Sequence, residues 1–421
     1  MVVVFVLVAV AVLTLLGVLH WYVWRRLVRD TTAPGSAARR AGRIVMIGLP
    51  LLTVATFVGG RTVLPFEVVQ VIAWPGYLWL AVFLYLLLAL AVGELVRPLL
   101  VRLPREKEAP RQAKVSELVT VPAGEASEES PAAAPEPASD APERAGGPSR
   151  RLFVSRVVAG TAAAAALGTV GYGAYGTLRG PKVKRVTVPL AKLPRSAHGF
   201  RIAVVSDIHL GPVLGRGFAQ RVVDTINATQ SDAIAVVGDL IDGNVEDLGP
   251  AVAPLAGLRA RHGAYFVTGN HEYISGAEQW VEHVQGLGLH LLPNARVELP
   301  GFDLAGVNDL AGEDEGQGPD FARALGDRDR TRASVLLAHQ PVVVHDAVRH
   351  GVDLQLSGHT HGGQMWPVSY VAALANPTLA GLERYEDTQL YVSRGAGAWG
   401  PPVRVGAPSD ITVIELASRQ A

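Results

Sequence analysis

The first hundred residues are dominated by long hydrophobic runs. Residues 2–24 contain no charge and are long enough to cross a bilayer as a helix. Residues 44–60 and 77–93 form two further runs, and Pro50 interrupts the first of these. A buried core helix is the alternative for each run, but no polar face accompanies any of them. The pattern therefore predicts an all-α, three-helix transmembrane region over residues 1–102.

Residues flanking these runs indicate their orientation. The third run has interfacial aromatic anchors at one end, namely Trp74, Tyr77 and Trp79. The first connection carries six arginines, namely Arg25, Arg26, Arg29, Arg39, Arg40 and Arg43. The second connection holds only Arg61 against Glu67. The positive-inside rule then places the N-terminus outside, the first connection inside, and the chain from Arg97 onward inside.

Between residues 103 and 148 the composition changes to Pro, Ala, Glu and Ser. Such a segment cannot bury enough apolar surface to build a core, so we predict a disordered cytoplasmic linker.

Residues 149–180 have the layout of an export signal in the interior of the chain. Ser149, Arg150 and Arg151 are followed by Phe153 and by a weakly hydrophobic, Ala- and Gly-rich stretch. This layout is typical of a twin-arginine signal, which makes the twin-arginine translocase an expected partner. No convincing cleavage site follows, so we expect an uncleaved signal anchor, that is, a fourth transmembrane helix. The alternative is an ordinary fourth helix with incidental arginines, and both interpretations deliver the remaining chain outside.

From residue 181 onward, short β-branched runs alternate with amphipathic segments. "RIAVVSD", "AIAVVGD" and "AYFVTGN" have the character of strands, and "FAQRVVDTINAT" between the first two has that of a helix. This alternation predicts a layered α/β domain over residues 181–421. The domain holds eleven of the twelve histidines and carries 20 basic against 26 acidic residues. No basic stripe is present in the sequence, so nucleic-acid binding is not expected.

Polar side chains recur where the predicted strands end. They are Asp207, His209, Asp239, Asp242, Asn270, His271, Glu272, His339, His359 and His361. Loops at the carboxyl ends of strands meet at one edge of a sheet, so we expect these side chains to converge. The chain has no cysteine, and a set of Asp, Asn and imidazole donors suits Mn²⁺, Fe or Zn²⁺.

Seven of these residues are more ligands than one ion needs. They are Asp207, His209, Asp239, Asn270, His339, His359 and His361. Seven ligands with one bridging carboxylate would serve two ions, divalent or Fe with a divalent partner. Two ions about 3.5–4 Å apart can generate a nucleophilic hydroxide and hold the attacking and leaving oxygens of a phosphoryl displacement. In an extended H-x-H, His359 and His361 would share one face of a strand and reach neighbouring ions.

In order, the motifs D-x-H, GD-x-x-D, GNHE, a strand-end His and GH-x-H resemble the signature of the calcineurin-like metallophosphoesterases, the superfamily that includes purple acid phosphatases. The resemblance covers about residues 186–416. "GHTHGGQ", together with the preceding membrane segment, and "SRGAGAWGPPVRVG" resemble the bacterial membrane-anchored branch. The resemblance implies a four-layer fold, in which two mixed β-sheets pack face to face with helices outside.

The resemblance also implies roles at the matching positions. Asp207, His209 and His361 would hold the first metal, Asn270, His339 and His359 the second, and Asp239 would bridge them. His271 would contact the phosphate and protonate the leaving oxygen. Asp242 and Glu272 would orient the ligands. Outside the motifs, Asn308 and Asp309 end another predicted strand and are candidates for contact with substrate.

The sequence therefore predicts a multi-pass membrane protein with a dinuclear phosphoesterase domain on the extracytoplasmic side. Its substrate would be a phosphomonoester, phosphodiester or pyrophosphate, cleaved by attack of a metal-bridging hydroxide. The membrane-anchored branch has relatives that act on nucleotide-linked lipids, which implies a lipid- or envelope-linked phosphoester as one class of substrate. The alternative function is a membrane sensor or scaffold whose metal domain binds a ligand without turnover.

Overall fold

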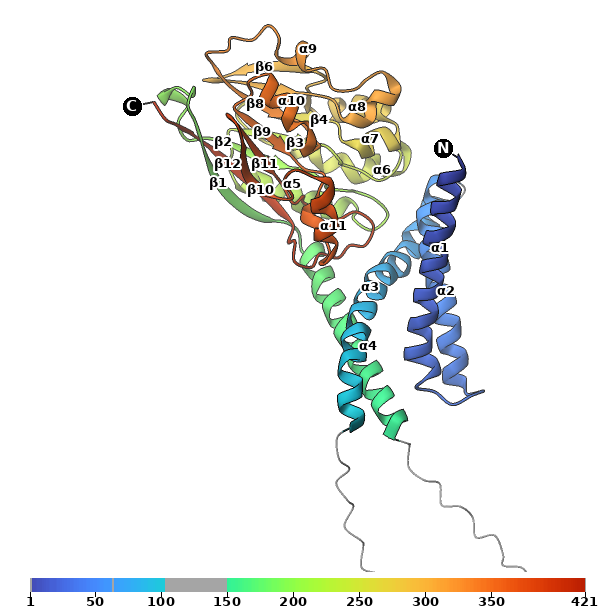
Figure 1. Ribbon diagram of the computed structural model, residues 1–421. Coiled ribbons are helices and arrows are strands. Elements are labelled where there is room, and N and C mark those ends of the chain that lie inside the picture. Colours follow the sequence, from blue (N-terminus) through green and yellow to red (C-terminus); the bar gives the residue numbers. More distant parts are fainter. Residues whose placement is uncertain (1, 63, 103–149, 421) are drawn as a thin grey trace, which may run out of the picture.

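The computed structural model describes residues 2–62, 64–102 and 150–420 (Figure 1). The predicted linker at residues 103–148 and Ser149 of the predicted signal lie outside the described residues. The described chain consists of long N-terminal helices followed by an α/β domain.

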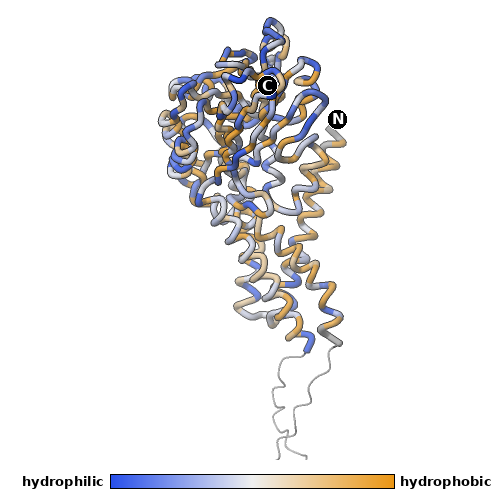
Figure 2. The backbone as a smooth tube through the Cα atoms, turned by 90° about the vertical axis from the view of Figure 1, so that its left-hand side faces the viewer, coloured by the Kyte–Doolittle hydropathy of each residue, from blue (hydrophilic) through white to orange (hydrophobic). Residues whose placement is uncertain are grey.

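Four long helices precede the α/β domain. α1 (Val2–Trp24) continues into a π-helical turn at Arg25–Arg29, α2 spans Ala37–Thr62, α3 spans Phe66–Arg102 and α4 spans Arg150–Leu178. Each contains a segment long and apolar enough to cross a membrane. Figure 2 shows hydrophobic colouring concentrated along the helices that extend from the domain. α2 begins before its predicted run because residues 37–43 are mainly Ala and Arg, which are strong helix formers, and α3 extends beyond its predicted run at both ends.

Arginines gather at the end of these helices that is remote from the α/β domain. The connection between α1 and α2, the last turn of α3 and the first turn of α4 all lie at that end (Figure 1). Arg26 forms ion pairs there with Asp30 (3.0 Å) and Glu94 (2.8 Å), and Arg156 Nε donates to the carbonyl of Thr31 (3.1 Å). The basic end of the helices and the α/β domain therefore lie at opposite ends of the four apolar segments.

Two six-stranded mixed sheets form the α/β domain. The first has the order β1-β12-β2-β3-β4-β5 and is parallel except between β12 and β2. Its strands are β1 (Lys182–Leu190), β12 (Asp410–Ser418), β2 (Phe200–Val205), β3 (Ala233–Val237), β4 (Ala264–Val267) and β5 (His290–Leu291). The second has the order β10-β11-β9-β8-β7-β6 and is antiparallel only at its two edges. Its strands are β10 (Gly381–Tyr385), β11 (Thr388–Val392), β9 (Leu354–Ser357), β8 (Ala333–Leu337), β7 (Phe302–Gly306) and β6 (Ala295–Leu299).

Alternation along the strands builds separate hydrophobic cores on the two faces of each sheet. In β2, Ile202 and Val204 point into the core between the sheets, whereas Ala203 and Val205 face the outer helices. The helices outside the first sheet are α5 (Arg216–Ala228), α6 (Val245–Val252) and α8 (Ala277–Gly286). Those outside the second sheet are α9 (Phe321–Leu325) and α10 (Val344–Arg349). The predicted α/β class and four-layer sandwich are thereby confirmed.

The long helices pack directly against loops of the α/β domain. The hydroxyl of Tyr85 on α3 donates to the carbonyl of Trp366 (2.9 Å), and the backbone N–H of Arg404 donates to the carbonyl of Gly173 in α4 (3.3 Å). A Cβ atom at Gly173 would lie 2.8 Å from the Arg404 carbonyl oxygen, so only glycine permits this approach. α4 also shares a hydrophobic cluster with Val403. The helices and the domain are therefore one packed unit.

Candidate metal centre

The candidate ligands come from loops at one edge of the two sheets. Asp207 and His209 follow β2, Asp239 follows β3, and Asn270 follows β4 at the start of the short helix α7 (Asn270–Ser275). His339 follows β8, and the pair His359 and His361 follows β9. These strands run parallel within their sheets, so their carboxyl ends deliver the side chains to a common edge.

The backbone at this edge is held in an unfavourable conformation. Nine non-glycine residues of the described chain have positive φ, and five of them are candidate ligands. They are Asp207 (50°), His209 (48°), Asp239 (53°), His359 (73°) and His361 (52°). Each such residue costs about 1–2 kcal/mol relative to the right-handed region. Strain of this kind persists where surrounding contacts over-determine the backbone, as they do at functional sites.

The first cluster consists of Asp207, His209 and His361, whose candidate ligand atoms all lie within 4.8 Å of one another. The Nε2 atoms of His209 and His361 are 3.1 Å apart, and His361 Nε2 is 3.4 Å from Asp207 Oδ1. Asp207 is fully buried, and its carboxylate also accepts the backbone N–H of His359 (3.0 Å).

The second cluster consists of Asp239, His339 and His359. His339 Nε2 lies 3.1 Å from Asp239 Oδ2, and Asn270 Oδ1 joins the group at 3.1 Å from His359 Nδ1. The same Oδ2 atom of Asp239 is 3.7 Å from His209 Nε2 of the first cluster. Asp239 therefore lies between the two clusters.

Hydrogen bonds from the surrounding chain orient the imidazoles. His339 Nδ1 lies 2.9 Å from the carbonyl of Val237, which fixes the proton on Nδ1 and leaves the Nε2 lone pair for a ligand. His209 Nδ1 is paired in the same way with Asp242 Oδ1 (2.8 Å). That oxygen also lies 2.7 Å from His271 Nδ1, so Asp242 links a candidate ligand with the candidate general acid.

Glu272 fastens two of the ligand loops together. It is fully buried, and its carboxylate accepts the backbone N–H groups of Asp239 (3.0 Å), Leu240 (2.7 Å) and Gly269 (2.6 Å). The Asp239 carboxylate in turn accepts the backbone N–H of His271 (2.9 Å). Burial, with the nearby Asp239 charge, raises the pKa of Glu272 to about 7.

The clustered charges shift the pKa values of the imidazoles in opposite directions. Burial opposes the charged form of His209, but Asp242, Asp239 and Asp207 outweigh burial and raise its pKa to about 9. The pKa of His361 is lowered well below its ordinary value by burial and by the neighbouring charges of His209 and Arg404. Without metal, the surroundings of the first cluster therefore favour the charged form of His209 and the neutral form of His361.

Comparisons with known proteins agree with this geometry. The family profile for "Calcineurin-like phosphoesterase" matches residues 200–363. A "Transmembrane protein with metallophosphoesterase domain" from Danio rerio is 39% identical over 259 residues, which cover 58% of this chain and 59% of that protein. An "Uncharacterized metallophosphoesterase" from Helicobacter pylori (strain J99) is 38% identical over 255 residues, covering 60% and 68% respectively. A further uncharacterized metallophosphoesterase, from Bacillus subtilis, is 30% identical over 280 residues, covering 64% and 98%.

The chain belongs to the calcineurin-like metallophosphoesterases. It spans less than two thirds of the length of the Danio rerio relative and nearly all of the Bacillus subtilis one. The matched profile ends at Gly363, so α11 (Val368–Ala375) and the loops that contact the long helices at Trp366 and Arg404 lie beyond it.

The donor set of this metallophosphoesterase fits divalent cations. Carboxylate and imidazole donors suit such ions, and His339 Nε2 is buried without a hydrogen-bond partner, although Asp239 is close. Ligand atoms around one ion with bonds of about 2.0–2.2 Å lie roughly 3 Å or more apart. The spacings of 3.1 and 3.4 Å in the first cluster match that arrangement.

The structure contradicts the expectation that His359 and His361 lie on one extended strand. The H-x-H sequence is not an extended strand, because β9 ends at Ser357 and His361 begins a 3₁₀ turn. His359 and His361 reach different clusters because both have positive φ, not because they share a strand face. Asp309 accepts Gln340 Nε2 (2.9 Å) beside His339, and Asn308 Nδ2 donates to the carbonyl of Gln317 (2.9 Å).

Arg404 has a structural role beside the first cluster. This metallophosphoesterase buries the Arg404 side chain, whose guanidinium donates to the carbonyls of His361 (3.0 Å), Gly397 (2.6 Å) and Arg394 (2.7 Å) and lies 3.3 Å from His361 Nδ1. Burial lowers the pKa of Arg404 to about 10. Arg404 thus fixes His361 and the C-terminal loop, and no spacing pattern in "PPVRVG" marks this role.

Proposed function

We propose that the protein hydrolyses a phosphoester with two metal ions held by seven ligands, namely Asp207, His209, Asp239, Asn270, His339, His359 and His361. The observation that carries the proposal is the position of Asp239 Oδ2, 3.1 Å from His339 Nε2 and 3.7 Å from His209 Nε2. A carboxylate between two donor clusters is the arrangement that a dinuclear site needs. Mn²⁺, Fe and Zn²⁺ suit this donor set.

Metal ions bound there would supply Lewis-acid activation of water and neutralise charge on the phosphoryl oxygens. The chain itself supplies the proton for the leaving group. His271 pairs through Nδ1 with Asp242 Oδ1 (2.7 Å), which orients the ring; in its imidazolium form His271 would carry a second proton on Nε2 and would donate that proton to the leaving oxygen. Trp399 lies against the same ring, with centroids 5.9 Å apart, and limits its rotation.

We further propose that the catalytic domain faces the extracytoplasmic side. The arginine-rich end of the helices would stay in the cytoplasm by the positive-inside rule, and the α/β domain lies at the opposite end (Figure 1). Arg150 and Arg151 at the start of α4 would present a twin-arginine signal to the translocase, and α4 would remain as an anchor. A lipid- or envelope-linked phosphoester fits a site held at the membrane.

The test is hydrolysis of p-nitrophenyl phosphate and bis-p-nitrophenyl phosphate by the full chain in detergent with added Mn²⁺. We expect turnover of at least one ester, and loss of it in Asp239→Asn. Turnover of neither ester, on a protein shown by metal analysis to hold two ions per chain, would reject the enzyme in favour of a metal-containing sensor or scaffold. Unchanged activity in Asp239→Asn would reject the proposed bridging role.

A further inference from the structure

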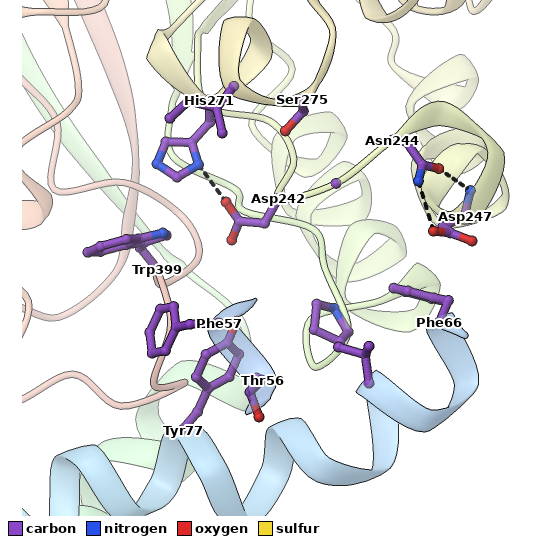
Figure 3. A pocket seen from close by; sticks show the side chains of 14 residues that line it. Thr56, Phe57, Phe66, Tyr77, Asp242, Asn244, Asp247, His271, Ser275 and Trp399 are labelled. Atoms are coloured by element: carbon purple, nitrogen blue, oxygen red, sulfur yellow. Dashed lines mark hydrogen bonds and ion pairs between the residues drawn. The ribbon is translucent and has the colours of Figure 1, made fainter. Parts of the chain in front are cut away.

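A pocket of about 270 Å³ leads to the candidate general acid, and part of its wall belongs to the membrane-type helices. Asp242, His271 and Trp399 line one side, and Phe57 of α2 and Tyr77 of α3 line the other. Figure 3 shows Trp399 below His271, with Phe57 and Tyr77 beneath it on the helices. Phe57 and Trp399, more than three hundred residues apart in sequence, therefore line one pocket.

The wall from the helices to the candidate general acid is a continuous row of aromatic rings. The centroids of Phe57 and Tyr77 are 5.1 Å apart, those of Phe57 and Trp399 are 6.2 Å apart, and those of Trp399 and His271 are 5.9 Å apart. Ring spacings of about 4.5–7 Å are those of favourable aromatic contacts. An apolar part of the substrate could therefore pack against these rings along the whole distance from the helices to His271.

The charges in the pocket argue against a second anionic group on the substrate. Asp242 and Asp247 are acidic, and no Lys or Arg is among the described residues that line the pocket. A further phosphate or carboxylate there would meet like charge without a cationic partner. The part of the substrate that extends from the phosphate into this pocket is therefore uncharged.

The pocket lies beside the N-terminal half of the candidate membrane span of α3. The candidate span of α3, Phe66–Leu99, has 34 residues, or about 51 Å of helix, whereas the hydrocarbon core is about 30 Å thick. Trp74, Tyr77 and Trp79 mark an interfacial belt on it, and Tyr77 is also a pocket residue. We therefore expect the pocket wall at Tyr77 to lie at the depth of the lipid headgroups.

α11 extends this apolar surface on the α/β domain. Each of its residues is exposed or half-buried, including Tyr370 (69% exposed), Val371 (67%) and Leu374 (88%). α11 follows Trp366, whose carbonyl accepts the Tyr85 hydroxyl of α3, so it is held beside the membrane helices. An exposed helix of this composition is suited to the interface of a bilayer.

We propose that the substrate is an amphiphilic phosphoester drawn from the bilayer, with its apolar group packed against Phe57, Tyr77 and Trp399. The proposal rests on the hydrolytic function proposed above and gives the long helices α2 and α3 a role in substrate selection. The pocket is smaller than the 300–1,000 Å³ typical of a site that encloses a whole ligand. It therefore holds the region next to the phosphate, while the remaining chain stays in lipid.

The test compares hexadecyl p-nitrophenyl phosphate with ethyl p-nitrophenyl phosphate in mixed micelles, using the full chain. The two diesters share the reacting phosphate and leaving group and carry the variable chain on the ester that is retained, whereas the monoesters named next carry it on the leaving oxygen. Phosphatidic acid and glycerol phosphate form the corresponding pair of monoesters, with release of inorganic phosphate as the readout. We expect the wild type to prefer the long-chain member in kcat/KM by about tenfold or more, as burial of a few methylene groups predicts.

Phe57→Ala should lower the long-to-short ratio of kcat/KM by about tenfold, and Phe57→Leu should lower it less. The control is Leu51→Ala on the same helix, which is 63% exposed, lies outside the pocket and should keep the wild-type ratio. A wild-type ratio near one would overturn the inference without any variant, and so would a wild-type ratio in folded Phe57→Ala. If the wild type cleaves no ester of either pair, the proposed function fails together with the inference.

Discussion

The Nδ1 atom of His271 lies 2.7 Å from Asp242 Oδ1, the same oxygen that lies 2.8 Å from His209 Nδ1. One carboxylate therefore orients both the candidate proton donor and a candidate metal ligand. Burial opposes its negative charge, but the two imidazoles outweigh burial and lower the pKa of Asp242 to about 2. Asp242 is consequently ionised at neutral pH.

Asp242→Asn should lower both metal affinity and activity by about 10- to 100-fold. The amide carries no negative charge, so its oxygen would be a weaker acceptor for the hydrogen bonds from His209 and His271. Steady-state kinetics with a metal titration measures both effects. Asp224→Asn on α5 is the matched control, because Asp224 is exposed and bonds only to Gln220 among the hydrogen bonds of the described chain. Equal effects of the two substitutions would contradict the orienting role of Asp242.

Glu272→Ala should destabilise the fold by about 3 kcal/mol or more. It would leave the buried N–H groups of Asp239, Leu240 and Gly269 without an acceptor, at about 1–3 kcal/mol each. We expect the midpoint of thermal unfolding to fall by roughly 6–12 °C, measured by differential scanning fluorimetry on the metal-free protein. Glu282→Ala, at an exposed site on α8, should leave the midpoint unchanged within about 1–2 °C.

The stabilisation given by Mn²⁺ should increase between pH 6.5 and pH 9. In the metal-free fold the pKa of His209 is raised from 6.5 to about 9, so its protonated form stabilises that fold fully below pH 6.5. This contribution is lost as the pH rises towards 9, and the ring then binds metal without first releasing a proton. The shift in unfolding midpoint on adding Mn²⁺ should therefore grow across this window. A shift independent of pH would show that His209 is not a ligand.

Gly358→Ala should abolish metal binding or lower it by at least tenfold. A Cβ atom at this position would clash with the carboxylate of Asp207 and lie 2.5 Å from Ser206 Oγ, both fully buried. Displacing them costs about 1–3 kcal/mol and moves a candidate ligand. Gly286→Ala at the end of α8 is the control, since no atom lies within 4 Å of its added Cβ. Metal content per chain after dialysis distinguishes the two variants.

The double variant Arg150→Lys, Arg151→Lys keeps the positive charge at the start of α4 but removes the arginine pair. We expect the α/β domain to lose its accessibility to protease added to intact cells, because translocation would fail. The control is Arg156→Lys, which lies in α4 outside the pair. Unchanged accessibility in the double variant would show that the arginines act only as a basic flank.

The fold class followed from the sequence because alternating strand and helix patterns are local. Ile202 and Val204 face one core and Ala203 and Val205 the other, as a period of two requires. The convergence of the polar residues at the carboxyl ends of β2, β3, β4 and β8 also followed from the sequence, because these ends lie at one edge of the sheets. The turn at His359 and His361 did not follow, since positive φ at non-glycine residues depends on contacts formed elsewhere.

The contribution of the N-terminal helices to the site was also invisible in the sequence. Phe57 and Tyr77 lie in hydrophobic runs that composition explains completely as membrane spans. Their approach to Trp399 depends on how two distant parts of the chain pack. The roles of Arg404 and Gly173 depend on the same packing, and no local pattern encodes it.

The contact between Tyr85 and Trp366 links the position of α3 in the membrane to the loops beside the candidate metal site. Trp366 is two residues from Gln364, whose amide bonds to the backbone of Trp399 at both its carbonyl and its N–H (each 3.0 Å). A thinner or thicker membrane would change the tilt of a long helix such as α3, and these contacts connect α3 with the residue that forms the aromatic wall, Trp399. Removing the helices would take Phe57 and Tyr77 from the wall of the pocket that leads to His271, and with them the surface proposed to select the substrate.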